Sequence, residues 1–229
     1  SPAIYMSSTF SHSQLGDTTG YQYTRESNPT RDRLEQLIAD LEEGTDALAF
    51  SSGMAAVDAV FHLFSPGDHI ILGDDLYGGS IRMFTNIYEQ NGIEFTYVGT
   101  SDLDAVKAAF KPNTKAVYIE TPTNPMMEIT DIRALCALAH ERNALVIIDN
   151  TFLSPYFQKP LTLGADIVVH SGTKFIGGHH DVISGFTIVK DDELAAKLRL
   201  IYKTVGACLS AMDSWLVIRG VKTLALRME

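Results

Sequence analysis

Strand and helix signals alternate along most of this chain of 229 residues, and this alternation constrains the fold more than any other feature. Short apolar runs bounded by turn residues predict strands at residues 47–50, 69–72, 94–98, 114–120, 144–149, 166–169 and 183–189. Apolar residues three or four positions apart predict helices at residues 53–64, 79–89, 102–110 and 132–142. Such a pattern predicts an α/β fold in which helices cover both faces of a mostly parallel sheet. Ligands of such sheets bind beyond the carboxyl ends of the strands.

The two ends of the chain differ from this alternating middle. Residues 1–27 are polar, rich in Ser, Thr and Tyr, and without a sustained period, so we expect an extended N-terminal arm. A helix is then expected to begin at Asn28-Pro29 and to stop at Gly44. We expect the strand at 183–189 to turn back like a hairpin, and residues 191–229 to be helical throughout. Because the apolar helical pattern runs to the last residues, we expect the chain to be a fragment that more protein follows.

Composition and charge exclude several classes of partner. The formal net charge of −10 argues against binding to nucleic acid or to an anionic membrane. No apolar stretch is long enough to span a bilayer, and no secretion signal is visible, although the chain does not begin with Met. Cys136 and Cys208 lie far apart in helical apolar patterns, which favours buried free thiols and a reducing cytoplasm.

Two charged residues follow neighbouring strands in an informative order. The apolar run 144–149 ends on Asp149, and the next strand leads into Ser171-Gly172-Thr173-Lys174. Alone, a lysine there is more often a surface charge, and an aspartate more often a turn former or helix cap. Together they suit pyridoxal 5′-phosphate (PLP), which needs a lysine for its aldehyde, an acid for its pyridinium nitrogen and small hydroxyl residues for its phosphate. Ser171 and Thr173 supply such hydroxyls.

Three further segments fit the same cofactor. Small residues at Gly53-Met54, between a strand and a helix, allow backbone N–H groups to bind an anion, although a simple helix cap is the common alternative. Tyr77 follows a strand and could stack on the pyridine ring, with Gly78-Gly79 leaving room for it; a turn tyrosine is the alternative. Asn124 could donate to the phenolic oxygen of the cofactor, or could belong to a rigid Pro-rich turn.

The ordered set of motifs resembles one enzyme family over essentially the whole chain. The motifs are Tyr23-Thr24-Arg25, Asn28-Pro29-Thr30, Ser52-Gly53-Met54-Ala55, Tyr77-Gly78-Gly79, Thr121-Pro122-Thr123-Asn124-Pro125, Asp149-Asn150-Thr151 and Ser171-Gly172-Thr173-Lys174. In this order they resemble the Cys/Met-metabolism PLP-dependent enzymes, which have the PLP-dependent transferase fold type I. The resemblance implies transsulfuration chemistry on cystathionine or activated homoserine, by elimination, as in cystathionine γ-lyase, or by replacement at the γ carbon, as in cystathionine γ-synthase.

The resemblance also implies roles for individual residues. Lys174 would hold the cofactor aldehyde, Asp149 would pair with the pyridinium nitrogen, and Tyr77 would stack on the ring and assist the departing group. Other residues would bind the phosphate within one subunit: Gly53, Met54, Ser171 and Thr173. Tyr23 and Arg25 would reach the phosphate of a neighbouring subunit.

These implied roles divide the chain and require self-association. Residues 1–45 would form the arm and first helix that contact the neighbouring subunit, and residues 46–229 the large PLP-binding domain. A small C-terminal domain, which carries the arginine for the substrate carboxylate in this family, would be missing. The active form would be a homodimer or homotetramer that acts on a small amino-acid substrate.

Several alternatives remain within and outside this family. Gly79 stands where methionine γ-lyases typically carry Cys, which lowers that possibility. Cystathionine β-lyase and O-acetylhomoserine sulfhydrylase stay open, as does a fragment that binds PLP but is catalytically incomplete. A PLP-dependent decarboxylase or aminotransferase is disfavoured by the Tyr-Gly-Gly and Tyr-Thr-Arg motifs. No Gly-x-Gly-x-x-Gly follows a strand, so a nicotinamide cofactor is not expected. His179 and His180 lack a third ligand, so no metal is expected.

Overall fold

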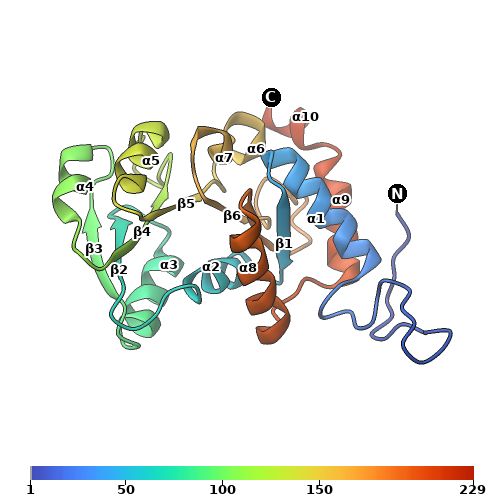
Figure 1. Cartoon of the computed structure of the whole chain (residues 1–229). Coiled ribbons are helices and arrows are strands. Elements are labelled where there is room, and N and C mark those ends of the chain that lie inside the picture. Colours follow the sequence, from blue (N-terminus) through green and yellow to red (C-terminus); the bar gives the residue numbers. More distant parts are fainter. Residues whose placement is uncertain (1) are drawn as a thin grey trace.

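The computed structural model describes residues 2–229, and its centre is a twisted sheet of seven strands (Figure 1). Across the sheet the order is β1-β7-β6-β5-β4-β2-β3. The strands are β1 (Asp46–Phe50), β2 (His69–Gly73), β3 (Glu94–Val98), β4 (Thr114–Glu120), β5 (Leu145–Asp149), β6 (Ile167–Ser171) and β7 (Gly185–Val189). Each strand lies where the apolar runs of the sequence predict one.

The sheet is mostly parallel, as predicted. Strands β3, β2, β4, β5 and β6 pair in parallel, whereas β7 runs antiparallel to both β6 and β1. The return of β7 beside β6 confirms the expected hairpin-like neighbour. Because β2 to β6 point the same way, the residues that follow them meet at one edge of the sheet.

Helices cover both faces of the sheet (Figure 1). On one face lie α2 (Gly53–Phe61), α3 (Gly78–Met83) with its continuation η1 (Phe84–Tyr88), and α8 (Asp192–Val205). On the other face lie α1 (Pro29–Glu42), α4 (Leu103–Ala109), α5 (Ile132–His140), α7 (Pro160–Leu163) and α9 (Ala211–Val221). Two short helices, α6 (Ser154–Phe157) and α10 (Leu224–Met228), complete the set in residues 2–229.

Strand β4 shows how alternation fixes the two faces. Ala116 and Tyr118 pack in the core beneath α2 and α3, and Val117 and Ile119 pack in the core beneath α4 and α5. Burial of each large apolar side chain stabilises the fold by about 1.5–3 kcal/mol, so a register shift of one residue would be costly. The same alternation directs Glu120, the last residue of β4, to the face of α2 and α3.

The C-terminal prediction was wrong in one respect. Residues 191–229 are not helical throughout, because Gly206 ends α8 with a φ of 85° and the chain then crosses to α9. Cys208 lies in this linker, half-buried, and forms an isolated bridge with Phe50 instead of lying in a helix. Cys136, by contrast, is buried in α5 as predicted, and both thiols are free.

Two helices also end differently from expectation. Helix α1 ends at Glu42 and is capped by Glu43, which takes the left-handed conformation (φ 58°), and not by Gly44. Gly44 is small for a packing reason, because a Cβ there would lie 2.5 Å from Cγ2 of Ile188. The single helix predicted at 79–89 begins as α3 and continues as one turn of π-helix, η1.

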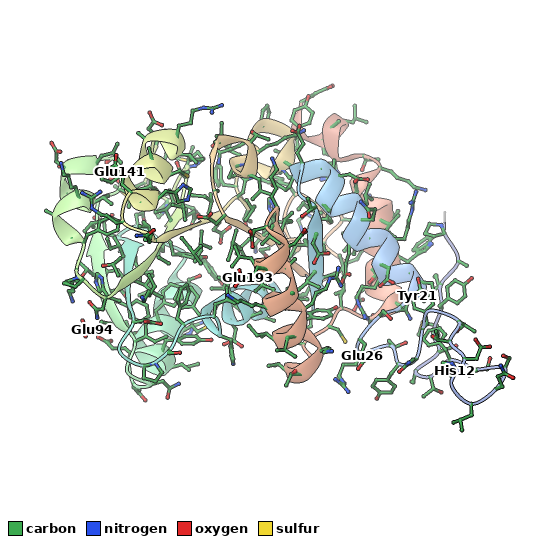
Figure 2. The ribbon with its side chains drawn as sticks, in the orientation of Figure 1. His12, Tyr21, Glu26, Glu94, Glu141 and Glu193 are labelled. Atoms are coloured by element: carbon green, nitrogen blue, oxygen red, sulfur yellow. The ribbon has the colours of Figure 1, made fainter. Side chains whose placement is uncertain are left out.

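The N-terminal arm lies outside the layers of sheet and helices. Residues 2–27 contain no helix or strand, and they fold back through a bridge between Thr9 and Tyr23. Figure 2 shows His12 and Tyr21 on this arm, beyond the body of the molecule. Within residues 2–229 no helix has the length and apolar character needed to cross a membrane.

Candidate active site

Three polar residues end neighbouring parallel strands at the same edge of the sheet. Glu120, Asp149 and Ser171 are the last residues of β4, β5 and β6. Glu120 and Asp149 are also register partners, and alternation places all three on the face where α2 and α3 lie. The predicted meeting of the Asp149 and Ser171–Lys174 segments is therefore explained by strand order and register.

The start of α2 and Ser171 form a small cradle suited to an anion. Ser52 caps the helix by accepting the N–H of Ala55 (3.1 Å), while the N–H groups of Gly53 and Met54 in the first turn have no intrahelical acceptor. A Cβ on Gly53 would lie 2.8 Å from Cβ of Ser171, so only glycine allows this approach. Free N–H groups at a helix start, beside a serine hydroxyl, fit a phosphate.

Asp149 is held in place by two donors. Its Oδ1 accepts the N–H of Thr151 (3.0 Å), and its Oδ2 accepts the hydroxyl of Tyr118 (3.4 Å). Burial, with the nearby Asp149 charge, holds the pKa of Tyr118 well above its usual value, so this phenol remains a donor. The carboxyl group of Asp149 is thus held in a defined position at the end of β5.

Lys174 combines an anchored backbone with a free side chain. Its carbonyl accepts the N–H of Gly178 (2.8 Å), and Arg227 of α10 donates to the carbonyl of Phe175 (2.6 Å). The ammonium group is exposed and forms no hydrogen bond or ion pair within residues 2–229. Such a lysine is available for an aldehyde. The hydroxyl of Thr173 is engaged with the backbone of Ser184, so its phosphate role remains a prediction.

Tyr77 is fixed through its backbone and packs against a glycine. Its N–H donates to Oε2 of Glu120 (3.1 Å), while the residue is 54% exposed. A Cβ on Gly79 would lie 2.3 Å from Cε1 of Tyr77, whereas one on Gly78 would meet nothing within 4 Å. The room that Gly79 leaves is occupied by the ring of Tyr77.

Three predicted residues are not drawn into this cluster. Arg25 donates to the carbonyl of Lys203, and its guanidinium lies 5.3 Å from the ring of Tyr23. Neither residue contacts Lys174 or Asp149 in the described part of the chain, so their expected role at a neighbouring subunit stays a prediction. Asn124 is exposed on the loop after β4, and its side chain forms no hydrogen bond within residues 2–229.

Glu120 and Tyr118 were missed by sequence reasoning. Burial and the charge of Asp149 raise the pKa of Glu120 to about 7, while the N–H groups of Tyr77 and Asn124 act in the opposite direction. The alternation of apolar residues in β4 could have indicated both residues, because it places Tyr118 and Glu120 on the same face of the sheet. In the structure Glu120 is the register partner of Asp149.

A second buried network supports the strand ends from the opposite face. Glu42, at the end of α1, accepts hydrogen bonds from Nδ2 of Asn150 (2.8 Å) and from Nε2 of His170 (2.5 Å). Asn150 follows Asp149, and His170 precedes Ser171. This network therefore holds the two segments that present the site. Within residues 2–229 no cluster of His, Cys, Asp and Glu could hold a metal ion.

Comparison with known proteins identifies the family. The family model for Cys/Met metabolism PLP-dependent enzymes matches residues 1–229. The chain belongs to this family. The resemblance of the motifs to it is thereby confirmed.

Individual relatives in this family have different activities. The chain is 51% identical to a cystathionine γ-lyase of Bacillus subtilis (strain 168) and 51% identical to a cystathionine β-lyase of Lactococcus lactis subsp. cremoris (strain MG1363), in each case over 99% of this chain and 60% of the relative. A crystal structure of cystathionine γ-synthase from Xanthomonas oryzae pv. oryzae, in complex with aminoacrylate and cysteine, superposes with a TM-score of 0.96 at 39% identity. That match covers 98% of this chain and 58% of the solved one. The chain thus spans about 60% of the length of these curated relatives.

Proposed function

We propose that this chain is the PLP-binding part of a transsulfuration enzyme that acts on cystathionine or activated homoserine. The reaction is elimination or replacement at the γ carbon. The observation that carries the proposal is the shared edge of the sheet, where Asp149, Ser171 and the free Lys174 follow adjacent strands beside the start of α2.

The residues at this edge fit PLP. Gly53, Met54 and Ser171 would bind its phosphate in the cradle described above. Asp149 would supply the carboxyl group that pairs with the pyridinium nitrogen. Thr173 and Asn124 are further ligands in the proposal. When bound, PLP supplies an electron sink for the carbanion that forms at Cα of an amino acid.

The protein side chains then move protons. Lys174 would hold the cofactor aldehyde, and its amine would take the proton from Cα of the substrate. Asp149 would pair with the ring nitrogen. Tyr77, exposed and with its backbone fixed, donates a proton to the departing group.

A second reaction is favoured by one comparison. The Lactococcus cystathionine β-lyase is as similar to this chain as the Bacillus γ-lyase, at 51% identity. Elimination at the β carbon is therefore the alternative within the same site. O-acetylhomoserine sulfhydrylase is a further alternative, and methionine γ-lyase is a less favoured one because Gly79 stands where those enzymes typically carry Cys. A PLP-binding but catalytically incomplete piece is a further one, since the chain spans about 60% of its relatives.

The proposal includes self-association in the cytoplasm. The exposed arm, with Tyr23 and Arg25 far along the chain from Lys174, is suited to complete the site of a neighbouring copy. A homodimer is the minimum, and a homotetramer is its extension. Residues 1–45 act as the contact segment, and residues 46–229 act as the cofactor-binding domain.

Product analysis with L-cystathionine tests the reaction. The purified protein, loaded with PLP, is incubated with L-cystathionine, and the keto acids are identified. Release of 2-oxobutyrate supports γ-elimination, and pyruvate supports the β-lyase alternative. Cystathionine formed from cysteine and an O-acyl homoserine supports γ-replacement. Absence of all three reactions in a protein that binds PLP contradicts the proposed activity.

A further inference from the structure

Glu120 is a buried acid within the proposed site, and the proposed mechanism assigns it no role. It ends β4 directly beside Asp149 in the register of the sheet, and it is only 7% exposed. Within residues 2–229 its carboxyl group forms no ion pair with a lysine, arginine or histidine. A buried acid without a cation needs another explanation.

The contacts of Glu120 lead to Tyr77. Oε2 of Glu120 accepts the N–H of Tyr77 (3.1 Å), and the N–H of Asn124 also acts on the same carboxyl group. Tyr77 is the N-cap of α3 but provides no side-chain cap, so Glu120 supplies an acceptor from the sheet. A single carboxyl group thereby ties the segment that carries Tyr77 to the strand beside Asp149.

The charges around Glu120 favour its neutral form. The ionisable groups that act on it are Asp149 on β5, Asp75 in the turn before α3, and the hydroxyl of Tyr118 on its own strand. Burial is the main cause that raises the pKa of Glu120 to about 7, and the negative charges of Asp149 and Asp75 add to it.

We propose that Glu120 is a positioning residue, whose buried carboxyl group fixes the backbone of Tyr77 and holds a proton beside Asp149. The expected effect of Glu120 on catalysis rests on the proposed function. The presence of a protonated, buried Glu120 bonded to the N–H of Tyr77 does not depend on the reaction.

Infrared difference spectroscopy tests the proton. Glu120→Gln keeps an acceptor for Tyr77 but has no carboxyl group. At pH 6, the spectrum of the wild-type holoenzyme minus that of the variant is expected to show a protonated-carboxyl band that is absent at pH 9. Glu43→Gln is the control, because Glu43 is exposed and Lys159 lowers its pKa, so no such band is expected there. A difference spectrum for Glu120 without the band at pH 6 overturns the inference.

Kinetics test the positioning of Tyr77. Glu120→Ala is expected to lower kcat about tenfold with less effect on KM, because a shifted catalytic group loses its alignment. Glu120→Gln is expected to stay within about threefold of the wild type. Equal rates for all three proteins overturn the inference, and if Glu120→Ala does not fold, the infrared experiment on Glu120→Gln still decides. A wild-type protein without PLP binding or turnover refutes the proposed function instead, and the same infrared comparison on the protein without PLP still tests the proton on Glu120.

Discussion

Gly78 and Gly79 are adjacent glycines with different surroundings, and this difference can be tested. Gly79→Ala places a Cβ 2.3 Å from Cε1 of Tyr77, so the ring must rotate away. We expect kcat to fall about tenfold while the thermal midpoint changes little, because alanine favours the helix. Gly78→Ala is the matched control, since its Cβ meets nothing within 4 Å. Equal kcat values for the two variants would show that the position of the Tyr77 ring is unimportant.

At the residue scale the sequence predicted which strand ends lie side by side better than it predicted the residues that support them. Lys174 and Asp149 were predicted because each follows an apolar strand, and parallel strands bring such residues to one edge. Glu120 was not predicted, because an acid at a strand end is usually a solvated turn residue. Only its register beside Asp149 and its burial distinguish it.

At the scale of elements, the junction of α1 with β5 and β6 depends on one buried carboxylate. Glu42→Ala leaves Nδ2 of Asn150 with one acceptor fewer and Nε2 of His170 without its partner. We expect the free energy of unfolding to fall by about 2–4 kcal/mol. PLP affinity should fall with it, because the two segments that present Asp149 and Ser171 lose their common anchor. Chemical denaturation and PLP titration measure the two effects.

The neighbouring Glu43 provides the control for Glu42. It lies at the same end of α1, but its carboxylate is exposed and pairs with Lys159 (2.7 Å). Glu43→Ala should leave both stability and PLP affinity nearly unchanged. If Glu42→Ala behaves like Glu43→Ala, the buried network does not support the site.

Helix α1 also carries a pH-dependent contribution to stability. Burial raises the pKa of Glu35 from 4.5 to about 7, against the opposing effects of Arg199 and Arg31. Between these values the folded protein retains a proton that the unfolded chain has released. The free energy of unfolding therefore falls as pH rises through this window, by about 2–3 kcal/mol from this residue.

Glu35→Gln removes this contribution. Denaturation at pH 5 and pH 7.5 should show a smaller loss of stability with pH for Glu35→Gln than for the wild type. Glu141→Gln, at an exposed carboxylate on the surface (Figure 2), should keep the wild-type difference. A wild-type pH difference in Glu35→Gln would mean that Glu35 is ionised in the fold at pH 5.

Elements were predicted well where burial alternates and poorly where an apolar run leaves a helix. Strand β4 was predicted because its alternating residues pack in two different cores. The linker after Gly206 was taken for helix because Cys208 and Leu209 continue an apolar pattern. In the structure the side chain of Leu209 packs in the core beneath α1 and α9, while its N–H donates to the carbonyl of Ala49 (2.9 Å) on the edge strand β1. Local periodicity does not contain such a contact between distant segments.

At the scale of the whole molecule, the N-terminal arm can contribute Arg25 either to the site of its own subunit or to that of a neighbouring subunit. Arg25 is expected to act on a neighbouring copy, so variants with different defects should complement each other. Arg25→Ala and Lys174→Ala should each be nearly inactive. Mixed after unfolding and refolding in equal amounts, they should regain about a quarter of wild-type activity, because half of the dimers then carry one intact site of two. If Arg25 acts within its own subunit, the mixture stays inactive.

The central claim is that PLP binds at the shared strand edge with its aldehyde on Lys174, and one measurement tests it directly. The purified protein is loaded with PLP, reduced with borohydride to fix the cofactor to the amine that holds it, digested and mapped by mass spectrometry. The account predicts one pyridoxyl-modified peptide, the one that contains Lys174, with a modification that Lys174→Ala lacks. Modification at another lysine, or none in a protein that has been shown to be folded, would contradict the account.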